Sequence, residues 1–331
     1  MSTKALVTGG GGFLGKAIIK RLLDRGWDVC SFSRGDYPEL RALGVEVVRG
    51  DIQDASAVSA AVEGCDIVFH VAAKVGSWGK FEDFYGANVI GTQRILDACQ
   101  EHQVERLVYT SSPSVVFGGG DMKGVDESVP YPETYKAFYP QTKAEAERRV
   151  RQAGEDGVVK TITIRPHLIW GPEDTNLVPR ILERASSLRI IGEGDNLVDT
   201  IYIDNAADAH ILAADALSEK PELAGRVYFI SQDEPVNCWE MINDILRAGG
   251  KPPLTRKISL KAAYRIAGMM EFVYKLFGIR SEPRLTRFVV GELATSHWFD
   301  ISAAKNDLGF VPKVSTEEGL KRLAEWLQTP S

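Results

Sequence analysis

The chain has 331 residues, of which 44% are hydrophobic and 25% are charged, enough for one large or two moderate domains with an apolar core. Its formal net charge of −6 gives no general attraction to nucleic acid or to an anionic membrane. The four cysteines (Cys30, Cys65, Cys99 and Cys238) form no CxxC pair, which favours buried thiols in a reducing compartment over a metal site or disulfides. Without a signal peptide or a run of about 18 uncharged apolar residues, the sequence predicts a cytoplasmic protein.

The first 165 residues alternate strand-like and helix-like segments. Short apolar runs predict strands at 4–10, 28–34, 45–51, 66–73, 105–112 and 158–166. Helical periodicity predicts helices at 13–26, 55–65, 87–102 and 143–152. Because strands that alternate with helices form parallel βαβ units, we expect an α/β fold, a Rossmann-type doubly wound parallel sheet with helices on both faces.

After Pro166 this alternation ends. One more strand is predicted at 226–231, beside a helix at 204–217, and the remaining sequence is mixed. We therefore expect a smaller C-terminal substrate domain that shares the chain discontinuously with the first. The predicted division is a dinucleotide-binding domain at 1–165, rejoined by about 200–232, and a substrate domain at 166–199 and 233–331.

The segment 261–277, KAAYRIAGMMEFVYKLF, is apolar over most of its circumference and is interrupted by Arg265, Glu271 and Lys275. Such a helix fits burial in the core or a dimer interface. It also fits a lining or lid for a long apolar substrate, or contact with a membrane surface. The sequence leaves these alternatives open.

Four consecutive glycines follow the first predicted strand, in the run TGGGGFLG at 8–15. Because glycine weakens both helices and strands, such a run indicates a need for bare backbone. Gly9, Gly12 and Gly15 give TGxxGFxG, and Gly10 with the last two gives GxGxxG. Glycines so placed make a tight turn, let the backbone approach a pyrophosphate and bring the helix close to the strand. The motif predicts dinucleotide binding.

The end of the second strand distinguishes NAD from NADP. An NAD site usually has an acidic residue there for the ribose 2′-hydroxyl, whereas an NADP site needs a cation. Ser33 and Arg34 occupy this position, and Asp36 comes later, after a glycine. Since Arg34 can bind a 2′-phosphate and stack on adenine, we expect NADP(H).

The sequence YPQTK places Tyr139 and Lys143 four residues apart at the start of a helix, so both side chains project to one side. Because Pro140 favours the first helical position, Tyr139 is predicted to be the N-cap. The helix dipole and the Lys143 ammonium would stabilise the phenolate and lower the pKa of Tyr139 from about 10. The pair predicts general-acid chemistry near neutral pH.

Hydroxyl side chains follow the fifth predicted strand, in YTSSPSV at 109–115. The carboxyl ends of parallel strands are where such sheets bind ligands. We select Ser112 as the hydroxyl that orients a substrate carbonyl, with Ser111 and Ser114 as alternatives.

These motifs, together with Asp51 in RGD, HVAA, Asn88 in ANVIGT, RPHLIWGP and YIDNAADAH, resemble the extended short-chain dehydrogenase/reductase superfamily, and within it the 3-beta-hydroxysteroid dehydrogenase branch. The resemblance covers essentially the whole chain. It implies an oxidoreductase acting on CH–OH groups, with Tyr139 as the proton donor, Lys143 on the ribose hydroxyls and Ser112 on the carbonyl.

The resemblance also implies further contacts with the cofactor. Asn88 would support the site through its helix, although Asn88 and Asp51 also fit a helix cap or a polar turn. The implied cofactor residues beyond those above are Phe13 and Leu14 in the glycine motif, Asp51 and Ile52 at adenine, Ala72, Ala73 and Lys74 at the nicotinamide ribose, and Pro166 at the carboxamide.

A narrower resemblance, to the 2-alkyl-3-oxoalkanoate reductases of bacterial olefin biosynthesis, appears in GSWG at 76–79, NLVDTIYIDNAADAH and SHWFD. It implies reduction of a β-keto acid with two long alkyl chains, a lipid-like substrate, by NADPH, and association with other enzymes of the pathway. The substrate carboxylate needs a partner, and the sequence does not choose among His167, Arg180 and Lys74; His167 also fits a packed core histidine. Trp78 fits either the core or a cover over the cofactor.

Three alternatives remain: a sterol or steroid dehydrogenase, a nucleotide-sugar epimerase or dehydratase that holds NAD, and a non-catalytic dinucleotide sensor. Arg34 argues against the second, and the presence of Tyr139 and Lys143 argues against the third. We expect a homodimer that needs no metal and binds no nucleic acid.

Overall fold

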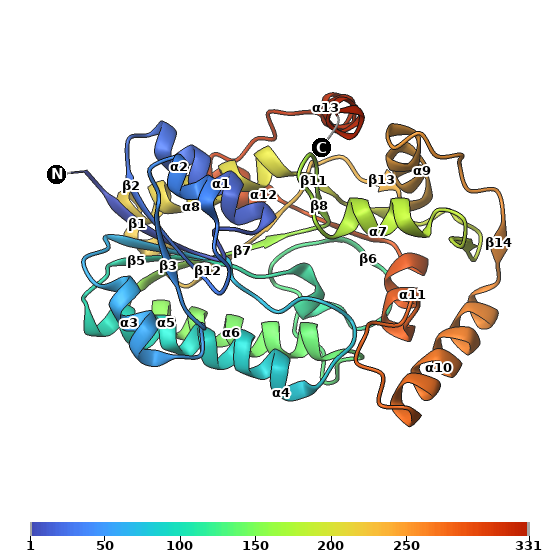
Figure 1. The fold of residues 1–331 in the computed structure, drawn as a ribbon, viewed down its shortest axis with the longest axis horizontal. Helices are drawn as coiled ribbons and strands as arrows, with labels where there is room; N and C mark the ends of the chain where they lie inside the picture. The colour runs from blue at the N-terminus through green and yellow to red at the C-terminus, as the bar shows by residue number, and fades with distance from the viewer. Residues whose placement is uncertain (1, 330–331) are drawn as a thin grey trace.

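The computed structural model describes residues 2–329, and a sheet of seven parallel strands forms the centre of the protein (Figure 1). The strand order is β12-β7-β5-β4-β1-β2-β3. Its members are β1 (Lys4–Thr8), β2 (Asp28–Ser33), β3 (Glu46–Arg49), β4 (Ile67–His70), β5 (Arg106–Thr110), β7 (Lys160–Pro166) and β12 (Arg226–Ile230). These are the seven predicted strands, so the doubly wound parallel sheet is confirmed.

Helices cover both faces of the sheet (Figure 1). They are α1 (Phe13–Asp24), α2 (Pro38–Ala42), α3 (Ala55–Val62), α4 (Phe81–Phe84), α5 (Gly91–Glu101), α6 (Phe138–Glu155) and α8 (Ile203–Glu219). Because side chains alternate along a strand, Leu6 of β1 packs with α3, α5 and α6, whereas Ala5 and Val7 pack with α1 and α8 on the other face. Both faces are therefore buried, which explains the nearly continuous apolar strands.

The site lies where the direction of winding reverses. β1 pairs with β2 on one side and with β4 on the other, and both neighbours are parallel to it. In open α/β sheets, ligands bind outside the carboxyl ends of the strands at this point. The chain leaves β1 into the glycine run and leaves β4 into the segment 71–74.

Two helices differ from their predicted form. The segment predicted as one helix at 87–102 is α5 preceded by a π-helical turn, Tyr85–Ile90, which continues from α4. Helix α6 begins at Phe138 and its N-cap is Ala137, so the prediction that Tyr139 is the N-cap is wrong. Pro140 fits the third helical position because the first N–H groups of a helix have no intrahelical partner.

Most of the chain after β7, together with the segment 113–125 between β5 and α6, forms small sheets, helices and turns next to the main sheet. One four-stranded sheet has the order β13-β10-β15-β6, and two further sheets pair β11 with β8 and β14 with β9. The strands are β6 (Met122–Val125), β8 (Ile169–Trp170), β9 (Ile190–Ile191), β10 (Leu197–Val198), β11 (Ile201–Tyr202), β13 (Val236–Asn237), β14 (Lys257–Ile258) and β15 (His297–Phe299). The helices are α7 (Leu177–Arg184), α9 (Cys238–Ala248), α10 (Leu260–Leu276), α11 (Arg287–Ala294), α12 (Ser302–Leu308) and α13 (Thr316–Gln328), with 3₁₀ turns at Pro113–Val116 and Pro221–Leu223. The predicted domain boundaries stay a prediction.

The four cysteine thiols are buried and free, as predicted. Burial raises the pKa of Cys30, Cys99 and Cys238 to about 12. Within residues 2–329, no group of three or more His, Cys, Asp or Glu side chains could hold a metal ion.

Candidate active site

A cavity of about 1240 Å³ runs along the carboxyl ends of the central strands. Every residue predicted to bind the cofactor or to take part in catalysis lines it: Gly9, Gly12, Phe13, Leu14, Gly15, Ser33, Arg34, Asp51, Ile52, Ala72, Ala73, Lys74, Ser112, Tyr139, Lys143 and Pro166. Sites for one small molecule have volumes of roughly 300–1,000 Å³. The cavity therefore has room for a dinucleotide together with a substrate.

The glycine run forms a turn whose backbone has no room for side chains. Gly9 has a φ of +69°, and a Cβ there would lie 3.0 Å from the Cα of Ala72. A Cβ on Gly15 would lie 2.8 Å from the Cα of Gly10. Gly12 is the N-cap of α1 and provides no side-chain cap, so the N–H groups of the first helical turn remain available to an anion. This bare backbone at a helix N-terminus fits the pyrophosphate of a dinucleotide.

Replacing Gly15 with alanine is expected to weaken binding of the dinucleotide by about tenfold or more, because the new Cβ forces α1 away from the turn at Gly9 and Gly10. Titration of the protein with NADPH, followed by fluorescence, measures the effect. Gly120→Ala is the matched control, since a Cβ on Gly120 would meet nothing within 4 Å. Equal affinities of the two variants would contradict the role of the close packing at Gly15.

Arg34 lies at the end of β2 with an exposed side chain that lines the cavity. The nearby carboxylate of Asp36 pairs with Arg41 instead. Among residues 2–329, Arg34 takes part in no ion pair, so its guanidinium is available to a ligand. Sequence reasoning missed Tyr37, whose ring covers Gly11 and lines the same part of the cavity; an aromatic residue three positions after Arg34 was the available signal.

Asp51 and Ile52 line the cavity beyond β3. The Asp51 carboxylate accepts a hydrogen bond of 2.9 Å from the backbone N–H of Gln53, which forms a tight turn. Ile52 packs closely against Gly91 at the start of α5. The Asp51 carboxylate therefore stabilises the turn, as the polar-turn alternative expected. The contact of Asp51 with adenine stays a prediction.

Asn88 joins the segment after β4 to the catalytic helix. Its side-chain oxygen accepts from the N–H of Lys74 at 2.7 Å, and its side-chain nitrogen donates to the carbonyl of Lys74 and to Thr142 Oγ1, both at 3.0 Å. Asn88 is buried in the π-helical turn, a departure from α-helical geometry that is frequent at functional sites. These contacts fix residues 72–74 relative to α6, consistent with the supporting role predicted for Asn88.

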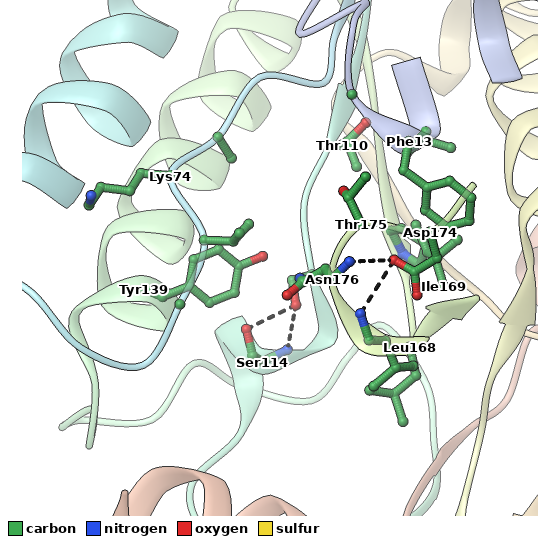
Figure 2. A pocket seen from close by; sticks show the side chains of 18 of the residues that line it. Phe13, Lys74, Thr110, Ser114, Tyr139, Leu168, Ile169, Asp174, Thr175 and Asn176 are labelled. Atoms are coloured by element: carbon green, nitrogen blue, oxygen red, sulfur yellow. Dashed lines mark hydrogen bonds between the residues drawn. The ribbon is translucent and has the colours of Figure 1, made fainter. Parts of the chain in front are cut away.

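Tyr139 and Lys143 lie on one side of α6 and both line the cavity; in Figure 2 the Tyr139 ring projects into it. The Lys143 ammonium is buried, donates a hydrogen bond of 2.6 Å to the carbonyl of Thr110, and lies 4.1 Å from the centre of the Tyr109 ring. The carboxyl end of β5 therefore fixes the position of Lys143. The phenol of Tyr139 and the amine of Lys143 both line the cavity, and both come from α6.

The predicted fall in the pKa of Tyr139 is wrong for the protein without cofactor. Burial raises the pKa of Tyr139 to about 12, and the nearby hydroxyl of Ser112 offsets only part of this effect. Burial also lowers the pKa of Lys143 to about 7. The prediction counted the helix dipole and the ammonium but not the loss of water around both groups, which disfavours their charged forms.

The three candidate serines have different surroundings. Ser112 caps the 3₁₀ turn Pro113–Val116, and its Oγ lies 2.9 Å from Oγ of Ser114 (Figure 2). Ser111 is buried and lies beside Glu147. Burial raises the pKa of Glu147, but Arg165 and, to a smaller extent, Ser111 lower it, and the net pKa is below its ordinary value. All three serines line the cavity, and the hydroxyl of Ser112 is the one that lowers the pKa of Tyr139, so its contact with a carbonyl oxygen stays a prediction.

None of the three groups predicted to bind a substrate carboxylate presents a free positive charge beside Tyr139. His167 Nε2 lies 2.6 Å from Nδ1 of His297, and burial lowers the pKa of His167 well below its ordinary value. Arg180 pairs with Glu282 at 2.7 Å. Lys74 Nζ lies 5.3 Å from the centre of the Phe84 ring, and in Figure 2 its side chain extends away from the Tyr139 hydroxyl.

Trp78 does not line the main cavity. Its indole N–H donates to the carbonyl of Ile279 at 3.2 Å, and its ring meets Tyr274 edge to face. The suggestion that Trp78 covers the cofactor is therefore not supported by its position; it attaches the segment after β4 to the end of α10.

Helices α7, α9 and α11 supply an apolar part of the cavity that the sequence did not reveal. Its apolar lining includes Leu177, Ile181, Leu188, Met241, Ile242, Ile245, Phe288, Val289 and Leu293. Glu292 of α11 and His297 of β15 also line the cavity. Burial raises the pKa of Glu292 to about 7, and this carboxyl contributes to the raised pKa of Tyr139. Glu292 stands in an ordinary apolar helix pattern, which gave no signal of its position.

Comparison with known proteins supports the class that the fold and the cavity define, an oxidoreductase with a nicotinamide dinucleotide site. Residues 6–261 match the 3-beta hydroxysteroid dehydrogenase/isomerase family. A 2-alkyl-3-oxoalkanoate reductase from Stenotrophomonas maltophilia (strain K279a) is 50% identical over 325 residues, which cover 97% of this chain and 98% of that protein. A second 2-alkyl-3-oxoalkanoate reductase, from Shewanella oneidensis, is 48% identical over 328 residues, 96% of this chain and 85% of that protein.

Solved structures agree with the fold. The crystal structure of gox2253 superimposes with a TM-score of 0.79 at 26% identity and covers 99% of this chain and 98% of its own. The UDP-glucose 4-epimerase of Thermus thermophilus, in complex with NAD, has a TM-score of 0.73 at 23% identity, over 99% of this chain and 100% of that chain. The chain belongs to the 3-beta hydroxysteroid dehydrogenase/isomerase family, within the extended short-chain dehydrogenase/reductases, which are oxidoreductases acting on CH–OH groups.

Proposed function

We propose that the protein reduces the ketone of a 2-alkyl-3-oxoalkanoate to the secondary alcohol, with NADPH as the reductant, as a step of olefin biosynthesis. Two relatives of about half-identical sequence carry the name of this reaction. The observation that carries the proposal is the position of Tyr139, Ser112 and Lys143 between the glycine turn and the apolar part of one cavity. A carbonyl group with long alkyl substituents matches a polar centre next to an apolar chamber.

The chain's own residues divide the chemistry between them. When bound, a reduced nicotinamide supplies the hydride for the ketone carbon. Tyr139 gives its proton to the developing alkoxide oxygen, and Ser112 donates a hydrogen bond to the same oxygen. Lys143, fixed by the carbonyl of Thr110, would bind the ribose hydroxyls, and its positive charge would lower the barrier to losing the phenol proton. The apolar walls exclude water, which strengthens both interactions with the oxygen.

NADP rather than NAD is favoured by the charges at the adenosine end of the cavity. Arg34 is free to bind a 2′-phosphate, while Arg41 neutralises the nearby carboxylate of Asp36. Arg34→Asp is expected to change the ratio of kcat/KM for NADPH over NADH by on the order of 10–100-fold toward NADH, because a hydrogen-bonded charge pair is lost. Initial rates with both cofactors measure this ratio.

Arg49→Asp serves as the matched control for Arg34→Asp. Arg49 ends β3 as an exposed side chain outside the lining of the cavity, so its replacement changes net charge without touching the cofactor. Similar cofactor ratios for wild-type protein, Arg34→Asp and Arg49→Asp would remove Arg34 from the site and leave the cofactor choice without its support.

The proposed substrate is tested by a panel assay in both directions. The purified protein is given NADPH with 2-alkyl-3-oxoalkanoates of several chain lengths, and NADP⁺ with the corresponding 2-alkyl-3-hydroxyalkanoates. A sterol with NAD⁺ and a UDP-sugar with NAD⁺ form the comparison arms. We expect turnover of the two-chain acids alone. Preferential turnover of the sterol, or epimerisation of the sugar without net change in the cofactor, would overturn the proposal.

A further inference from the structure

Helix α10 has its large apolar side chains on the outside. Small residues, Ala263 and Ala267, are buried on the side that packs against α11. The opposite side carries Phe272 with 64%, Leu276 with 64% and Phe277 with 72% of its surface exposed. We call the exposed set Ile266, Met269, Phe272, Val273, Leu276 and Phe277 the α10 face. In Figure 1 the helix lies at the edge of the molecule, so burial of the segment in the core is wrong.

The segment that carries the α10 face is basic, although the whole chain is acidic. Residues 256–287 contain eight lysines and arginines and two acids, a net charge of +6 in a chain whose net charge is −6. Both acids are already in ion pairs, Glu271 with Arg287 and Glu282 with Arg180. The cations are Arg256, Lys257, Lys261, Arg265, Lys275, Arg280, Arg284 and Arg287. The remaining positive charge therefore surrounds an exposed apolar surface, a local feature that the overall charge conceals.

A second, basic cavity of about 620 Å³ lies at another side of α10, where Tyr274 and Lys275 line it. Its lining includes six cationic side chains: Lys74, Lys80, Lys136, Lys275, Arg280 and Arg287. It shares Lys74, Ser77, Asp83 and Phe288 with the main cavity. Lys275 of α10 therefore borders a cavity that meets the proposed substrate site at these four residues.

We infer that the α10 face docks on the surface of a bilayer containing anionic phospholipids. The apolar side chains enter the boundary between headgroups and acyl chains, and the surrounding lysines and arginines contact the phosphates. Within residues 2–329, no helix is long and apolar enough to cross the bilayer, so the contact is with its surface. A second copy of the chain is a poorer occupant, because a two-fold contact would bring two surfaces of charge +6 together.

Flotation of the cofactor-bound protein with vesicles tests this inference. We expect binding to vesicles of phosphatidylglycerol and phosphatidylcholine in equal parts, weaker binding at high salt, and little binding to phosphatidylcholine alone. Combined replacement of Arg265, Lys275 and Arg280 by glutamine is expected to weaken binding by on the order of a hundredfold. Combined Phe272→Ser and Leu276→Ser is expected to abolish it. Since all five residues are exposed, these variants should keep wild-type affinity for NADPH, which verifies folding.

Matched controls come from exposed residues elsewhere on the surface. Val311→Ser removes an apolar side chain that is 64% exposed, and Lys321→Gln removes an exposed charge; neither is expected to change vesicle binding. Absence of binding to anionic vesicles would overturn the inference. So would wild-type binding by the Phe272 and Leu276 variant, or a change from dimer to monomer in that variant, by light scattering, without any vesicle binding. Each outcome is independent of which ketone the protein reduces.

Discussion

Tyr139→Phe is expected to lower kcat for ketone reduction by about 10²–10⁴-fold, while the affinity for NADPH stays close to that of the wild-type protein. The phenol is the proton source for the alkoxide, and Phe keeps the ring that lines the cavity but has no proton to give. Stopped-flow or steady-state rates measure kcat, and a fluorescence titration measures cofactor binding. The separation of the two quantities distinguishes a lost acid from a damaged fold.

Tyr135→Phe is the control for this experiment. Tyr135 lies in the loop before α6, and its hydroxyl donates to the carbonyl of Val115 at 2.9 Å, outside the main cavity. Its replacement is expected to leave kcat within a few-fold of wild type, on the order of a single lost hydrogen bond. If Tyr139→Phe behaved like Tyr135→Phe, another group would have to supply the proton.

Glu147→Gln is expected to lower the free energy of unfolding by about 3–5 kcal/mol, the cost of leaving a buried charge without its partner. Glu147 and Arg165 form an ion pair with exposures of 0% and 1%, and Nε of Arg165 lies 3.0 Å from Oε2 of Glu147. Tyr131 also donates to this carboxylate. The pair joins β7 to α6, the helix that carries Tyr139, so its loss destabilises that helix.

Glu145→Gln provides the comparison, because Glu145 lies on the same helix two residues earlier. It pairs with Arg149 at 2.8 Å, and both side chains are partly exposed, 38% and 30%. A surface pair of this kind contributes about 0–1 kcal/mol. Urea denaturation of both variants measures the difference. Equal free energies of unfolding for Glu147→Gln and Glu145→Gln would mean that Arg165 pairs with another group or with water. The buried ion pair would then not stabilise α6.

The residues predicted to bind the cofactor or to take part in catalysis line one cavity, whereas Asn88 and Trp78, also predicted from short motifs, lie outside its lining. A motif such as TGxxGFxG or YPQTK is local, and once the seven strands are placed, the carboxyl edge of the sheet brings Gly9, Ser112 and Tyr139 together. The strands were predictable because each is a short apolar run between polar turns. Their roles in cofactor binding and catalysis remain to be tested by the variants above.

Properties that depend on distant parts of the chain were not predictable. The pKa of Tyr139 rises because residues from several elements, including Glu292 of α11, surround it. The apolar chamber comes from α7, α9 and α11, which share no motif and meet only through tertiary packing. The outward orientation of Phe272 and Leu276 was hidden because the segment is apolar over most of its circumference, so its sequence does not show which side packs against α11.

Transfer of deuterium from the cofactor to the product tests whether the protein reduces the ketone by hydride transfer. The protein is incubated with a 2-alkyl-3-oxoalkanoate and NADPH that carries deuterium at the transferable C4 position, and the product is analysed by mass spectrometry and NMR. We expect a 2-alkyl-3-hydroxyalkanoate with one deuterium on carbon 3, formed by the wild-type protein and not by Tyr139→Phe. An alcohol without deuterium at that carbon, or no alcohol while an alternative substrate of the panel is consumed, would contradict this expectation.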